Sequence, residues 1–117
     1  MDWRHDAEES MRGELLEILV LGLLLEKDKY GIELRKELCD RTGKIYDIQQ
    51  GTLYGVLHRM EEKGLIASYK VKEGTSRLRI YYRVEDFGRK YLKYCKKYFL
   101  RVFSGVMQLF EGEEDEE

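Results

Sequence analysis

Residues 50–84 read QGTLYGVLHRMEEKGLIASYKVKEGTSRLRIYYRV, and this stretch decides the fold. Its first part places apolar residues at positions i, i+3, i+4 and i+7, which is typical of an amphipathic helix, and the pattern ends at Gly64. Its second part alternates apolar and polar residues on both sides of a turn at 73–76, as a β-hairpin does. A helix that ends at a glycine and leads directly into a hairpin predicts the recognition helix and wing of a winged helix-turn-helix.

The polar positions of this stretch are the candidates for contact with DNA. Gln49, Gln50 and Thr52 at the start of the helix are expected to contact bases, and Tyr54 and Arg59 are expected to contact phosphates or bases. Two alternatives stay open: Gln50 or Thr52 merely caps the helix, and Tyr54 is half-buried against the wing. The outward faces of both strands are expected to be basic and to contact phosphates through Lys70, Lys72, Arg77, Arg79 and Arg83.

The charge distribution favours double-stranded DNA as a partner. The 117 residues carry a formal charge of −2, but the tail 111–117 holds six acidic residues and no basic one. Residues 1–110 therefore carry 21 basic against 17 acidic groups, and residues 70–101 alone carry 11 against three. Because affinity for phosphates depends on the local field, the acidic total does not exclude DNA.

Upstream of the recognition helix, two more helices are predicted. The first is expected to begin at Ser10, a good N-cap residue, because leucines recur at helical spacing from Leu15 to Leu24. Residues 1–9 are expected to be frayed. The second helix is expected over 30–41, and Gly43 follows it.

A last long helix is predicted over 86–110, and it is expected to form a homodimer. Its apolar residues repeat at spacings of three and four and are too many for one small domain to cover. A second copy of the chain is the commonest partner for such a face. The expected interface residues are Leu92, Cys95, Phe99, Val102, Val106 and Leu109.

Aromatic side chains beside this face suggest a small planar aromatic effector as a further partner. Flat rings that face each other across a two-fold axis can hold a planar ligand, and a cation would gain from the ring faces. The candidate residues are Trp3, Tyr91, Tyr94 and Tyr98. In the alternative, the rings simply fill the interface.

The fold class predicted from these patterns is mainly α with a small β-hairpin, namely a winged helix-turn-helix with a long C-terminal dimerisation helix. The domains are expected to be a DNA-binding domain over 10–84, the dimerisation helix over 85–110, and an acidic disordered tail over 111–117.

Several other classes of function find little support. The apolar run 18–25 is too short to span a membrane and no signal peptide precedes it, so a cytoplasmic location is expected. His5 and His58 have no cluster of ligands at metal spacing, and no metal or cofactor is expected. No catalytic motif stands out, so an enzyme is not expected. Two rivals remain: a winged-helix module for protein interactions, and a DNA-binding regulator that senses redox state through Cys39 or Cys95.

Together these residues resemble the PadR family of transcriptional regulators. The matching pieces are 19–25 followed by YGIEL at 30–34, then GTLY at 51–54, LHRME at 57–61, GLI at 64–66 and YYRV at 81–84 before Gly88. The resemblance implies a homodimer in which the last helix is exchanged against the partner's first and last helices. It also implies an inverted-repeat operator, usually repression, and release by phenolic acids or by flat, hydrophobic, often cationic compounds.

The chain departs from the family's pattern at two places. Gln49-Gln50 stands where Ser-Pro is frequent, and Gly55 stands where proline often follows the tyrosine. The first departure changes the groups available for base readout, because glutamine can pair bidentately with adenine. The operator sequence therefore cannot be carried over from the family.

Overall fold

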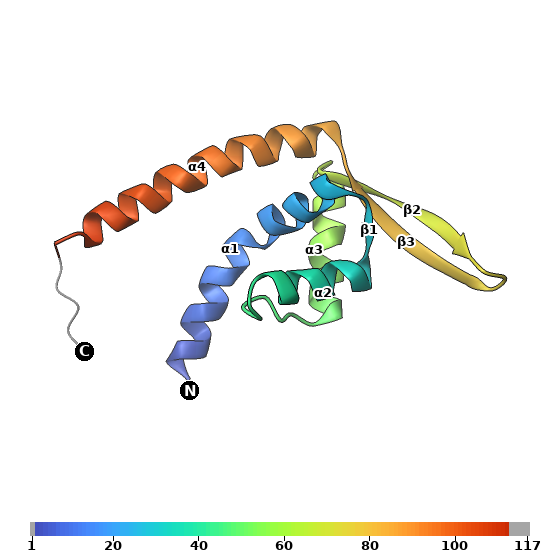
Figure 1. The fold of residues 1–117 in the computed structure, drawn as a ribbon, viewed down its shortest axis with the longest axis horizontal. Helices are drawn as coiled ribbons and strands as arrows, with labels where there is room; N and C mark the ends of the chain where they lie inside the picture. Colours follow the sequence, from blue (N-terminus) through green and yellow to red (C-terminus); the bar gives the residue numbers. More distant parts are fainter. Residues whose placement is uncertain (1, 113–117) are drawn as a thin grey trace.

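A computed structural model describes residues 2–112, and Figure 1 shows a helical body with a projecting hairpin and a projecting last helix. The predicted fold class is confirmed, with one strand more than expected. Residues 113–117, most of the predicted acidic tail, lie outside the described residues. In chain order the elements are α1 (Trp3–Glu26), β1 (Lys29–Tyr30), α2 (Gly31–Arg41), α3 (Gln50–Glu62), β2 (Ile66–Glu73), β3 (Arg77–Val84) and α4 (Asp86–Phe110).

Helix α1 begins at Trp3, so the prediction of a frayed segment before Ser10 was wrong. Asp2 caps the helix, because its side chain accepts a hydrogen bond from the backbone N–H of Arg4 at 3.1 Å. Such a cap satisfies one of the free N–H groups at a helix start and substitutes for the expected one at Ser10.

The strand that the sequence did not reveal is β1. It lies at the edge of a three-stranded antiparallel sheet of order β1-β3-β2 and pairs Lys29 with Tyr82. Two residues are too few to show an alternating pattern. Lys29 also looks like a turn residue, yet it is only 2% exposed, and its Nζ lies 3.1 Å from Glu37 and 3.6 Å from Glu26. Paired carboxylates are what make such a buried ammonium tolerable.

Helix α3 matches its prediction closely. Leu53, Val56, Leu57 and Met60 are its buried residues, as the spacing indicated. After the C-cap residue, the chain turns at Gly64, whose φ is +78°. The N–H of Gly64 donates to the carbonyl of Glu61, and the N–H of Leu65 donates to that of Met60. This is a Schellman motif, in which glycine takes the left-handed conformation without steric cost.

The core lies where α1, α2, α3 and the inner face of the sheet meet. Its fully buried side chains include Val20 and Leu21 of α1, Leu34 of α2 and Leu65 at the start of the wing. Leu92 of α4 belongs to the same core and is 1% exposed.

A close backbone approach fixes the start of α4 on this body. A Cβ on Gly88 would lie 2.2 Å from the carbonyl oxygen of Leu65 and 2.9 Å from a methyl of Val84. The same Leu65 oxygen accepts a hydrogen bond from the N–H of Glu85 at 2.9 Å. Beyond this first turn α4 runs away from the sheet and past α1 (Figure 1).

Candidate DNA-binding surface and helix α4

The start of α3 presents polar side chains away from the core. Gln49 is the N-cap residue with extended backbone, and Gln49 and Thr52 are both exposed. Arg59 is exposed two turns further along α3. Because the buried stripe holds the opposite side of the helix against α2 and the sheet, these side chains are free to meet a ligand.

Gln50 is placed differently from its two neighbours. Its amide nitrogen Nε2 is buried and has no hydrogen-bond partner in the described part of the chain, residues 2–112. Neither Gln50 nor Thr52 is the N-cap residue, so that alternative is wrong for both. An unpaired buried amide costs free energy, and this one would be relieved if the side chain turned outward.

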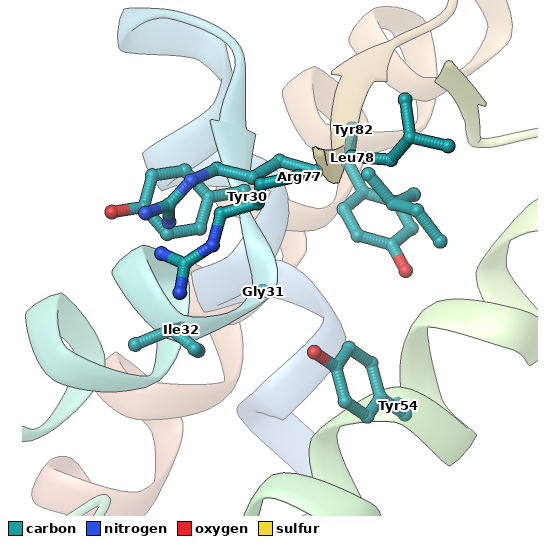
Figure 2. A pocket seen from close by; sticks show the side chains of 9 residues that line it. Tyr30, Gly31, Ile32, Tyr54, Arg77, Leu78 and Tyr82 are labelled. Atoms are coloured by element: carbon teal, nitrogen blue, oxygen red, sulfur yellow. The ribbon is translucent and has the colours of Figure 1, made fainter. Parts of the chain in front are cut away.

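Tyr54 lines a groove between the helices and the wing (Figure 2). The groove has a volume of about 520 Å³, and Figure 2 shows Ile32 and Gly31 of α2 on one side with Leu78 and Tyr82 of β3 on the other. A Cβ on Gly31 would lie 2.7 Å from the Tyr54 ring, so the absence of a side chain there is what lets the ring approach. Tyr54 is 45% exposed, which is close to the alternative that it is half-buried against the wing. Its ring contacts Gly31 of α2 as well as facing β3 of the wing.

The strand register corrects the expectation for the basic wing. In an antiparallel pair, residues directly opposite each other share one face of the sheet. Lys70 pairs with Ile80 and Lys72 pairs with Leu78, whereas Arg79 pairs with Val71. The two lysines therefore share a face with the apolar residues of β3, and the arginines occupy the other face: Arg77, Arg79 and Arg83. The wing does not have a single basic face.

The lysine face is the one that looks toward α3. Ser68, which shares this face, donates to Glu61 of α3 at 2.8 Å. Leu78 and Ile80, also on this face, line the groove together with Tyr54, as do Arg77 and Arg79 of the other face. Leu78 is 62% exposed and Ile80 is 46% exposed, although both are aliphatic. Lys70 and Lys72 are exposed and take part in no ion pair within residues 2–112. Cations without a protein partner are the groups best suited to phosphate contact.

The arginine face carries a stack of rings. Tyr81 lies between Tyr30 and Tyr69, with ring centroids 5.4 Å and 5.8 Å away. Arg79 lies over the Tyr30 ring at 4.2 Å and forms an ion pair with Glu73. The hydroxyl of Tyr69 donates a hydrogen bond to Asp28 at 2.5 Å. This bond, and to a smaller extent burial, raises the pKa of Tyr69. No local pattern in the sequence indicates this stack, because its members come from three different strands, β1, β2 and β3.

Helix α4 carries an apolar face that nothing in residues 2–112 covers. Phe99, Val102, Val106 and Leu109 are between 40% and 75% exposed. They follow one another at spacings of three and four residues, which is the repeat of a coiled-coil seam. Cys95 is half-buried on the same repeat. Leu92 is the exception, because it is buried in the core of its own chain and is not available to a partner, contrary to expectation.

The four candidate effector residues are not brought together within one chain. Tyr94 and Tyr98 are neighbours, with nearly parallel rings and centroids 6.4 Å apart, and both are exposed. Tyr91 is half-buried against α1, and burial raises its pKa. Trp3 is 68% exposed at the far end of α1. Since α1 meets α4 through Ile18 to Leu23, about 15 residues or ~22 Å of helix separate Trp3 from that contact. Within one chain Trp3 therefore lies apart from the other three rings, and its place in an effector site between two copies stays a prediction.

In the part of the chain that the structure describes, no metal site is assembled and the cysteines form no disulfide. No group of three or more His, Cys, Asp or Glu side chains there could hold a metal ion. The Nε2 of the exposed His58 lies 3.5 Å from a carboxylate oxygen of Glu62, one helical turn away. Cys39 and Cys95 are free and half-buried. Among residues 2–112, no helical segment combines the length and apolar character that a membrane crossing requires.

A recognition helix capped at an exposed polar end, a cationic wing beside it and a projecting apolar helix define a winged helix-turn-helix regulator. The model of the transcriptional regulator PadR-like family matches residues 20–94, and the chain belongs to that family.

The comparisons with individual proteins agree with this assignment. The chain is 36% identical over 102 residues to an uncharacterised protein X of Lysinibacillus sphaericus, and the match covers 87% of this chain and 93% of that one. It is similar to the crystal structure of a PadR family transcriptional regulator from Eggerthella lenta, with 32% identity, a TM-score of 0.84 and 96% of each chain covered. It also shares its fold with Bacillus subtilis PadR in complex with operator DNA, at 22% identity and a TM-score of 0.63, over 68% of this chain and 45% of that one.

Proposed function

We propose that the protein is a homodimeric repressor that binds an inverted-repeat operator through two copies of α3 and the wing. The observation that carries the proposal is the uncovered apolar seam of α4, which lies on the same chain as an exposed recognition helix. Two copies joined along this seam would present two recognition helices related by a two-fold axis, and a palindromic site mirrors that symmetry. The fold shared with an operator-bound PadR supports DNA as the ligand.

In the proposed complex, α3 and the wing contact different parts of the DNA. Gln49 and Thr52 at the exposed end of α3 meet base edges, with Arg59 beside them, and Gln50 contributes only after its side chain turns outward. Lys70, Lys72 and Arg77, which are exposed and take part in no ion pair within residues 2–112, meet phosphates from the wing. A cytoplasmic location would follow from this role.

The dimer is tested by replacing Phe99 and Val102 together with Glu. Both side chains are exposed in the single chain, so the substitutions leave the core intact and charge only the seam. We expect a folded monomer by light scattering and circular dichroism, and the loss of operator binding. Leu100→Glu is the matched control, because Leu100 is 63% exposed on the same helix but is not part of the three-and-four repeat. A double variant that remains a dimer would refute the seam.

Release by a planar aromatic effector is the finer part of the proposal. The exposed, parallel rings of Tyr94 and Tyr98 lie beside the seam, where a second copy would bring two more. Planar cationic dyes and phenolic acids should be titrated against the protein bound to DNA, with release of DNA as the readout. If release is unchanged when both tyrosines are replaced by Ala, this part of the proposal is wrong.

A further inference from the structure

We infer that Arg79 is a positioning residue that fixes the direction of the wing, and that phosphate contacts on the wing come from other cations. The inference rests on the proposed DNA binding and assigns different roles to different basic residues of the hairpin. It is motivated by the ion pair and the aromatic ring that hold Arg79 within the chain, since Arg77 on the same face of the wing takes part in neither contact within residues 2–112.

The guanidinium of Arg79 already has two partners in the chain. It forms an ion pair with Glu73 near the hairpin turn and lies 4.2 Å from the centroid of the Tyr30 ring. Its side chain is only 24% exposed, whereas Arg77 on the same strand and the same face is exposed and takes part in no ion pair within residues 2–112. A guanidinium that is stacked and paired would lose both contacts on moving to a phosphate.

The partners of Arg79 connect the wing to the body of the protein. Tyr30 is in β1 and is also the N-cap residue of α2, so it is fixed by the helical core. Glu73 is the last residue of β2 and is also 3.5 Å from the hydroxyl of Tyr81. Arg79 thus bridges the outer part of the hairpin to the first turn of α2. Figure 2 shows Tyr30 and Arg77 on one side of the groove, with Leu78 and Tyr82 on the other.

A bridge of this kind matters because, within residues 2–112, the outer part of the hairpin pairs with no third strand. Strand β1 pairs with Tyr81 and Tyr82. Among the described residues, the outer part of β3, from Arg77 to Ile80, therefore has β2 as its only strand neighbour. An isolated two-stranded ribbon is marginally stable and strongly twisted. Its direction decides where Lys70 and Lys72 lie relative to α3.

The test compares Arg79 with Arg77 by the salt dependence of DNA binding. Arg77→Ala should lower the slope of log K against log salt by about one, the value for one phosphate contact, and Arg77→Lys should restore it. Arg79→Lys keeps the charge but loses the planar stack, and it should weaken binding by roughly two- to five-fold, the size of an exposed cation–π contact, without changing the slope.

A second readout does not require DNA. Amide hydrogen exchange across 77–81 should be faster in Arg79→Lys than in the parent protein and unchanged in Arg77→Lys, because only the first variant loosens the bridge. A drop in slope for Arg79→Ala as large as that for Arg77→Ala, or unchanged exchange in Arg79→Lys, would overturn the inference while leaving the proposed function intact. A parent protein that binds no DNA would overturn both.

Discussion

Replacing Gly88 with Ala is expected to be among the most damaging single-methyl changes in the protein. The new Cβ would lie 2.2 Å from the carbonyl oxygen of Leu65, where a carbon and an oxygen normally approach no closer than about 3.3 Å. Helix α4 or the backbone at Leu65 must therefore shift by roughly 1 Å. Overpacking of this kind costs about 1–3 kcal/mol. Weakening the hydrogen bond from Glu85 to the same oxygen adds about 1 kcal/mol, for a total of ~2–4 kcal/mol.

Urea denaturation followed by circular dichroism measures this loss. Protein concentration must be held constant, because a dimer's apparent stability depends on it. Gly13→Ala is the matched control: Gly13 lies inside α1, and a Cβ there would meet no atom within 4 Å. The control should gain up to about 1 kcal/mol from helix propensity. If Gly88→Ala is as stable as Gly13→Ala, the close contact between α4 and the wing is not as described.

Three further changes test other parts of the fold. A hydrogen bond from Arg41 lowers the pKa of Glu26 from its usual 4.5 to about 2, so the ion pair stabilises the fold above pH 4.5 and this stabilisation is lost as the pH falls toward 2. Glu26→Gln should therefore flatten the dependence of the unfolding free energy on pH between these values. Parallel profiles for the variant and the parent would show that the ion pair between Glu26 and Arg41 does not stabilise the fold. Tyr46→Phe removes the hydroxyl that donates to the Arg12 carbonyl at 2.9 Å and should cost about 0.5–1.5 kcal/mol in urea denaturation, whereas no change would mean that the bond adds nothing. Leu92→Ala should cost about 2–5 kcal/mol by the same measurement, because this side chain fills the core. A loss below about 0.5 kcal/mol, typical of a surface position, would contradict the burial of Leu92 and favour its original assignment to the dimer interface.

The recognition helix was predictable because its signals are local. Four buried residues at helical spacing and a glycine at the end of the pattern indicate its inward face and its end. The structure has both, with Gly64 directly after the C-cap residue. The hairpin was predictable for the same reason, since alternation and a turn lie within 66–84. Strand β1 escaped prediction because its pairing with β3 is distant in sequence and its Lys29 is buried only through partners elsewhere in the chain.

The candidate site was predictable in residue type and less so in arrangement. Alternation indicates which residues of one strand share a face, but only the register between strands tells which faces coincide. Lys70 and Arg79 therefore looked equivalent in the sequence and lie on opposite faces in the structure. Leu92 and Phe99 share one helical repeat, and only the packing of α4 on α1 separates a core residue from an uncovered one.

Selection of binding sites from random double-stranded DNA by the purified protein tests the central claim most directly. A dimer joined along α4 with one recognition helix per copy predicts two copies of one half-site in inverted orientation. Their centres should lie about 10 base pairs, or a multiple of one helical turn, apart. Enrichment of a single unpaired half-site, or of no sequence at all, would contradict the account.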